Sequence, residues 1–131
     1  RPRPLGSETH TARTLAAKAA ERGACPTVVW HSGKLRARQT AEAFWRACNA
    51  LAECSSTRDL QPGDQPAWMV DRLRGETRDI LIAGHFPYMP RLLTLLLGAP
   101  EPSAVTFPKH GIVALESEDE GKTWRELWRI E

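Results

Sequence analysis

The sequence predicts an α/β protein, a three-layer α/β/α sandwich with a mostly parallel sheet and a C-terminal antiparallel hairpin. Two short runs, Thr27–Trp30 and Asp79–Ala83, are mostly apolar on successive residues, which is typical of strands covered on both faces. Segments with a helical spacing of apolar residues flank these runs. A turn at Asp119–Gly121 separates two further strand-like segments and predicts the hairpin, which would make the sheet mixed at one edge.

The elements are expected in a regular order along the chain. A first helix runs from Ser7 to Arg22, with Ser7 or Thr9 as N-cap and Gly23 beyond its end. After the first strand, a second helix runs from about Leu35 to Leu51, and Leu51 belongs to its inner face. The later elements are a short strand within 55–64, a short helix through Trp68, Val70 and Leu73, the strand at 79–83, a helix from about Pro90 to Gly98, and hairpin strands at 111–116 and 122–130.

Composition favours one soluble domain over residues 1–131. Apolar residues make up 41% of the chain and charged residues 26%, and the net charge of +2 is too small to indicate a nucleic-acid or membrane partner. No apolar run approaches the roughly 20 residues of a membrane span. The three cysteines have no metal-ligand spacing, and their odd number favours a reducing, cytoplasmic compartment over a disulfide framework. Two of them, Cys25 and Cys48, are expected in the core.

Two segments that follow predicted strands carry residues suited to binding an anion. Ligands of open α/β sheets bind beyond the carboxyl ends of the parallel strands. The segment His31–Glu42 places Arg36 in the first turn of a helix, where free amide groups favour negative charge. The segment Gly84–Pro87 places His85 at the same sheet edge. A guanidinium and an imidazole together predict a site for a phosphoryl group.

Simpler interpretations stand beside this one. An arginine in a first helical turn is usually a solvated surface residue, and a histidine after a strand is more often structural than catalytic. The neighbours of His85 favour a functional role, because Gly84 permits close approach of the backbone and Pro87 restricts the exit of the loop. The other three histidines, His10, His31 and His110, are expected at the surface or at helix starts.

Residues Ser32–Glu42 resemble the histidine-phosphatase pattern of a serine, a short spacer and Leu-Arg-Ala-x-Gln-Thr-Ala-Glu. Gly84–Pro87 is similar to the second histidine block of that superfamily. Arg3–Leu5 is similar to the Arg-Pro-Leu element of its short phosphohistidine-phosphatase branch, the SixA type. Further similarities lie in Leu60–Asp64 and in the terminal hairpin, entered by Lys109 and Gly111. The resemblance spans nearly the whole chain and implies a phosphoglycerate-mutase-like fold.

The resemblance also implies a reaction. In such phosphatases a histidine from an Arg-His-Gly block on the first strand attacks phosphorus, and water then releases phosphate. By matching motif, Arg36 is implied to bind the phosphoryl oxygens, with Ser32 as a further phosphate ligand, and His85 to stabilise the charge that develops. No metal or organic cofactor is implied. Asp64 and Glu42 are both candidates for a proton donor.

The 131 residues contain no Arg-His-Gly block. We therefore expect the domain to be N-terminally incomplete, lacking its first strand, and the chain as printed to be poorly stable or inactive. The resemblance implies a phosphohistidine phosphatase that acts on signalling or phosphotransfer proteins. Two alternatives remain open: a general phosphomonoesterase of small molecules, and a noncatalytic module that binds phosphate or a phosphoprotein.

Overall fold

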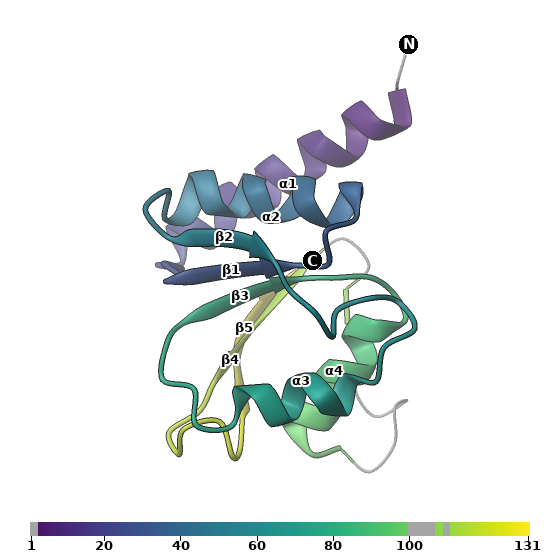
Figure 1. Cartoon of the computed structure of the whole chain (residues 1–131). Helices are drawn as coiled ribbons and strands as arrows, with labels where there is room; N and C mark the ends of the chain where they lie inside the picture. The colour runs from purple at the N-terminus through teal and green to yellow at the C-terminus, as the bar shows by residue number, and fades with distance from the viewer. Residues whose placement is uncertain (1–2, 100–106, 109–110) are drawn as a thin grey trace. The chain divides into compact units, whose positions relative to one another are not determined.

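A computed structural model gives the structure of the chain (Figure 1). It describes the backbone of residues 3–99, 107–108 and 111–131, and the side chains of these ranges from residue 12 onward. The chain divides into two compact units. The first takes in the chain up to Thr57, Arg78–Ala83 and Ile130, and the second takes in Arg58–Thr77, Gly84–Arg129 and Glu131. The single domain expected from the sequence remains a prediction.

The first unit is a parallel sheet with two helices. Strands β2 (Glu53–Ser56), β1 (Val28–His31) and β3 (Ile80–Ala83) lie in the order β2-β1-β3, and β1 is parallel to both neighbours. Helix α2 (Leu35–Cys48) packs on this sheet, and α1 (Arg3–Glu21) packs against α2 (Figure 1). The predicted alternation of helices and parallel strands is confirmed.

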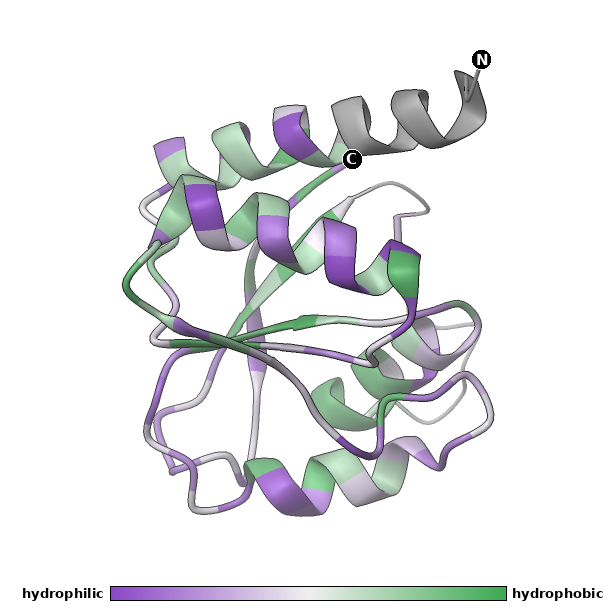
Figure 2. Cartoon of the chain, turned by 45° about the horizontal axis from the view of Figure 1, so that its top comes forward, coloured by the Kyte–Doolittle hydropathy of each residue, from purple (hydrophilic) through white to green (hydrophobic). Residues whose placement is uncertain are grey.

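The core of this unit lies between β1 and α2. All four residues of β1 are buried, as expected for an apolar run covered on both faces. Val29 of β1 packs with Ala41 of α2, Ala52 and Ala83. Figure 2 shows hydrophobic colour on parts of the strands and an alternation of hydrophobic and hydrophilic residues around α2. Strand β3 is less enclosed than expected, because it is fully buried only at Ala83.

The predicted start of the first helix is wrong. Helix α1 begins at Arg3, so Ser7 and Thr9 lie inside the helix and neither caps it. Arg3–Leu5, expected ahead of the helix, forms its first turn. Pro4 is compatible with that position, because the first N–H groups of a helix have no intrahelical partner to lose.

The predicted end of the second helix is also wrong. Helix α2 ends at Cys48, and Asn49 adopts an extended backbone conformation. The Asn49 side chain donates to the Pro26 carbonyl at 2.9 Å and accepts from the Leu51 amide at 3.1 Å. These bonds compete with continuation of the helix. Leu51 is consequently 96% exposed and does not belong to the inner face of α2.

The described residues of the second unit form two helices and a hairpin. Helices α3 (Pro66–Leu73) and α4 (Tyr88–Leu97) pack on each other, and α4 ends as predicted at Gly98, which adopts the left-handed conformation. Strands β4 (Ile112–Glu116) and β5 (Arg125–Ile130) form the predicted antiparallel hairpin. Among the described strands the hairpin makes a separate two-stranded sheet, so the mixed sheet edge expected from the sequence is not found.

Two further findings concern the chain as described. None of the helices within the described ranges has the length and hydropathy needed to cross a membrane. Cys25, expected in the core, is exposed, whereas Cys48 is half-buried and Cys54 lies half-buried in β2; all three are free thiols. Cys25 precedes Pro26 in the connection between α1 and β1, outside the apolar run that builds the core.

Candidate functional site

The three parallel strands end at one edge of the sheet. His31, the last residue of β1, is in register with Ser56 of β2 and Ala83 of β3, which are the last residues of those strands. Because carboxyl ends of parallel strands form the usual ligand-binding edge of an α/β sheet, the segments that follow these residues are the first place to look for a site.

Arg36 is the second residue of α2, and this helix begins directly beyond the edge. Its side chain is exposed, and Ser32, four residues earlier, is only 6% exposed. The hydroxyl of Ser32 accepts a hydrogen bond from the Lys34 amide at 3.3 Å. Gly33 between them has φ +89°, a conformation that glycine adopts without strain. The sequence thus provides a tight turn that leads the chain from β1 into α2.

The start of α2 is electropositive. Lys34, Arg36 and Arg38 bring three cationic side chains within five residues, and the first turn contains no acidic residue. The unpaired amide groups of a helix N-terminus add partial positive charge at the same place. Positive charge of this kind favours an anion, and the phosphoryl site at Arg36 stays a prediction.

His31 was expected at the surface, and that prediction is wrong. It is the fourth residue of β1 and is 6% exposed. Its Nδ1 accepts a hydrogen bond from the Gly33 amide at 3.0 Å, which assigns the proton of the neutral ring to Nε2. Burial lowers the pKa of His31; Glu42 acts against this and Arg38 adds to it. The sequence predicted that the strand ends at Trp30, whereas β1 continues for one more residue and includes His31. The side chains of His10 and His110 lie outside the described residues.

His85 is the second residue after the end of β3 and belongs to the second unit. It is half-buried, and its carbonyl accepts a hydrogen bond from the Met89 amide at 2.8 Å, which joins it to the first turn of α4. A Cβ on Gly84 would lie 2.8 Å from the Met89 Sδ. The contact involves the flexible end of the Met89 side chain, so the close backbone approach expected at Gly84 stays a prediction.

The candidate residues are thus distributed over both units. Arg36 and Ser32 lie in the first unit and His85 in the second, so a common site of all three remains a prediction. The two candidate proton donors are likewise divided, because Glu42 is in α2 and Asp64 is in the second unit. Asp64 accepts a hydrogen bond from the Gln61 amide at 3.0 Å. Within the side chains that the structure describes, no group of three or more His, Cys, Asp or Glu residues could hold a metal ion.

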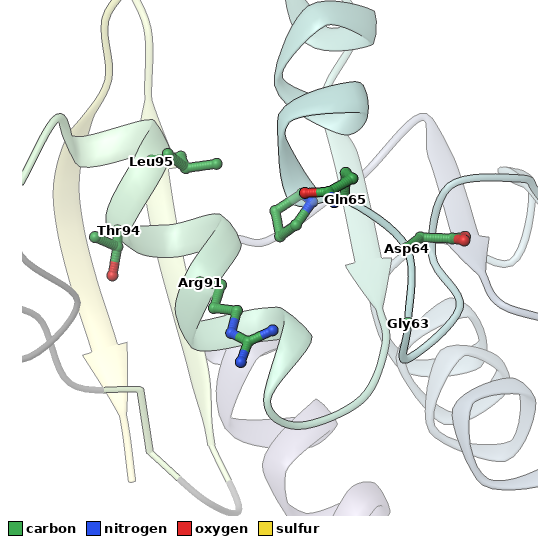
Figure 3. A pocket seen from close by; sticks show the side chains of 7 residues that line it. Gly63, Asp64, Gln65, Arg91, Thr94 and Leu95 are labelled. Carbon is green, nitrogen blue, oxygen red and sulfur yellow. The ribbon is translucent and has the colours of Figure 1, made fainter.

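The second unit contains a pocket that the sequence did not predict. It has a volume of about 290 Å³ and lies between α4 and the loop that enters α3 (Figure 3). The lining residues are Gly63, Asp64, Gln65, Pro66, Arg91, Thr94 and Leu95. The loop residues belong to the segment whose Pro-Gly pair marks a turn, but no sequence pattern indicated that α4 would lie against it.

No protein-family model and no curated protein matches the chain. Solved structures do match. A structure named as the phosphohistidine phosphatase SixA of Agrobacterium tumefaciens aligns with a TM-score of 0.76 at 23% identity, over 94% of this chain and 79% of that one. The protein histidine phosphatase SixA complexed with tungstate aligns with a TM-score of 0.70 at 18% identity, over 91% of this chain and 77% of that one. The phosphoglycerate mutase of Plasmodium falciparum aligns with a TM-score of 0.74 at 18% identity, over 92% of this chain and 80% of that one.

The chain is therefore an α/β protein with the phosphoglycerate-mutase-like fold. Within that fold, its structural neighbours include phosphatases of the SixA type, so the resemblance drawn from the motifs is confirmed at the level of the fold.

Proposed function

We propose that these residues belong to a phosphatase of the histidine-phosphatase type, which removes phosphate from phosphorylated histidines of signalling or phosphotransfer proteins. One observation carries the proposal: β1 and β3 end in register at His31 and Ala83, and the segments that follow them contain Arg36 and His85. The names of two structural neighbours support the substrate class, and one of these proteins is complexed with tungstate, a tetrahedral oxyanion like phosphate.

We assign to Arg36 the binding of the phosphoryl oxygens. Its planar guanidinium can donate two parallel hydrogen bonds to two oxygens of one phosphoryl group, and the amides of the first turn of α2 add further donors. Lys34 and Arg38 raise the positive potential around it without being needed as direct ligands. Ser32, buried at the end of β1, is assigned a supporting role in binding phosphate.

We assign to His85 the stabilisation of the charge that develops while the phosphoryl group is transferred. Two peptide units separate it from Ala83, so its Cα lies within roughly 7 Å of the Cα that ends β3. Covalent geometry therefore keeps its backbone close to the carboxyl edge. The hydrogen bond between its carbonyl and the Met89 amide, 2.8 Å long, restricts the backbone, as a preorganised donor requires.

In the proposed reaction a nucleophilic histidine nitrogen attacks phosphorus, the bond between phosphorus and the substrate nitrogen breaks, and water then releases inorganic phosphate. The printed residues contain no Arg-His-Gly block, so the proposal assigns to them only phosphate binding and charge stabilisation. The nucleophile would come from a segment outside these 131 residues.

The test uses the gene product expressed from its natural start codon and a histidine-phosphorylated phosphotransfer protein as substrate. We expect Arg36→Lys and His85→Gln each to lower kcat by about 10²–10³-fold, the usual cost of losing one preorganised donor. Arg46→Lys is the matched control, because Arg46 is an exposed arginine in the last turn of the same helix. Undiminished turnover in both site variants would refute the assignment.

The same experiment separates the alternatives. Faster turnover of small phosphate esters than of phosphohistidine would favour a general phosphomonoesterase. Phosphate binding that depends on Arg36 without any turnover would favour a noncatalytic module. The absence of an Arg-His-Gly block from the printed residues is the observation that keeps this last alternative in view.

A further inference from the structure

The pocket of the second unit is lined by a cation, Arg91, for which the described residues supply no partner. Arg91 lies in α4 and is exposed, and among the described residues its guanidinium makes no hydrogen bond or ion pair. The other arginines of this unit for which ion pairs are found, such as Arg72 with Asp59 at 3.6 Å, are already neutralised. An unpaired arginine in the wall of a pocket is available to an anionic ligand.

Arg91 is connected through α4 to the candidate catalytic histidine. The Met89 amide bonds to the His85 carbonyl, and the Arg91 amide lies 3.4 Å from the Pro87 carbonyl. Both residues are thus tied to the first turn of α4. In Figure 3 the Arg91 side chain points away from Leu95, toward this first turn, the direction in which helical side chains normally tilt.

The remaining lining residues restrict the kind of ligand. Leu95 and Pro66 provide apolar surface, and Gln65 provides an amide. Asp64 places a carboxylate in the opposite wall, and Figure 3 shows it pointing away from Arg91. The Asp64 carboxylate repels any anion in the pocket, but it repels a doubly charged phosphate group about twice as strongly as the single charge of an aspartate or glutamate side chain, which Arg91 alone can match.

We propose that Arg91 binds an acidic side chain of the phosphoprotein substrate, next to the phosphohistidine that His85 contacts. The proposal rests on the proposed function for the identity of the substrate. Arg91 then contributes to specificity, because it selects phosphohistidines with a nearby carboxylate. Leu95 and Pro66 contact the methylene groups of the bound side chain, and Gln65 hydrogen-bonds to the adjoining peptide.

The experiment measures binding, so that its result does not depend on turnover. Two fluorescent peptides carry the same non-hydrolysable phosphohistidine analogue, one flanked by glutamate and the other by glutamine at the same positions. Their dissociation constants are measured by fluorescence anisotropy with the gene product. We expect the glutamate peptide to bind about tenfold more tightly, which corresponds to about 1.4 kcal/mol.

Arg91→Gln should bring the two dissociation constants together, and Arg91→Glu should reverse the preference. Lys122→Gln is the control, because Lys122 is an exposed cation on the hairpin turn and does not line the pocket. It should keep the wild-type preference.

Equal binding of both peptides by the wild-type protein, or a preference that persists in Arg91→Gln, would overturn the role of Arg91. A gene product that releases no phosphate from any phosphohistidine substrate would instead overturn the proposed activity. In that case the ratio of the two binding constants would still decide whether Arg91 recognises a carboxylate.

Discussion

The Nδ1 atom of His31 accepts a hydrogen bond from the Gly33 amide, at 3.0 Å, where β1 turns into α2. An imidazole that accepts at Nδ1 is neutral and carries its proton on Nε2. Protonation of Nδ1 would replace this acceptor with a donor that faces another donor. Burial of the ring also disfavours the charged form, so the pKa of His31 is lowered from 6.5.

A lowered histidine pKa predicts that the unfolded chain binds more protons than the folded one below pH 6.5. Stability from this group is therefore fully present above pH 6.5 and is lost as pH falls through the folded pKa. We expect the free energy of unfolding of the wild type to decline more steeply below pH 6.5 than that of His31→Asn, whose side-chain oxygen can still accept from the Gly33 amide. Urea titrations at a series of pH values measure the difference, and parallel profiles would contradict it.

Tyr88 joins α4 to the loop before α3. It is 1% exposed, and its hydroxyl donates to the Asp59 carbonyl at 2.5 Å. We expect Tyr88→Phe to lower the free energy of unfolding by about 1 kcal/mol, because one hydrogen bond is removed while the aromatic ring keeps its packing. Chemical denaturation at pH 8 measures this change. A Tyr88→Leu variant is the comparison and should lose more, since it also leaves a cavity.

The same residue has a predicted effect at high pH. Burial, with the nearby carboxylates of Asp59 and Asp64, raises the pKa of Tyr88 to about 12. A raised pKa means that its contribution is complete below about pH 10 and disappears as pH rises toward about 12. The stability difference between wild type and Tyr88→Phe should therefore shrink above pH 10. A difference that stays constant up to pH 12 would rule out this assignment.

The sequence predicted most of the fold because its signals were local. The run through Val28 and Val29 identified β1, and Gly98 identified the end of α4. The errors occurred where a distant contact decided the outcome. Asn49 ends α2 by bonding to Pro26, 23 residues earlier, and no pattern around Leu51 contains that information.

The candidate site was predictable to a smaller extent. Arg36 and His85 could be named as candidates because each follows an apolar strand within a recognisable motif, and their roles stay predictions. His31 was misplaced because a polar residue at a strand end is normally assigned to the loop, and its burial depends on the turn at Gly33. Arg91 carried no local signal, since an arginine on a helix is usually solvated, and the pocket exists only because α4 lies against residues 63–66.

The hairpin turn depends on a glycine that lies against α3. Gly121 has φ +84°, and a Cβ at this position would lie 2.0 Å from the Leu73 carbonyl oxygen. We expect Gly121→Ala to lower the free energy of unfolding by about 2–4 kcal/mol, from backbone strain together with overpacking. Gly63→Ala is the matched control, because Gly63 has no atom within 4 Å of a built Cβ, and it should change stability by less than about 0.5 kcal/mol. Similar effects of the two substitutions would contradict the predicted close approach.

Asp119 organises the other side of the same turn. Its carboxylate accepts from the Thr123 amide at 2.9 Å, from the Thr123 hydroxyl at 2.6 Å and from the Ser117 hydroxyl at 2.8 Å. These bonds, with those to Thr123 the largest cause, lower the pKa of Asp119 to about 2. A lowered carboxyl pKa means that the stabilisation is present above the ordinary value of about 3.9 and is lost as pH falls toward about 2.

We therefore expect Asp119→Asn to unfold more readily than the wild type at pH 7, with the difference disappearing near pH 2. The amide keeps one acceptor, which can still serve the Thr123 amide and the Ser117 hydroxyl, but it replaces the second acceptor with a donor that faces the Thr123 hydroxyl. Glu118→Gln removes the same charge from an exposed neighbouring position and serves as the control for overall electrostatics. Thermal unfolding followed by circular dichroism between pH 2 and pH 7 makes the comparison. If Glu118→Gln reproduced the pH dependence of Asp119→Asn, net charge and not the hydrogen bonds of this turn would explain the effect.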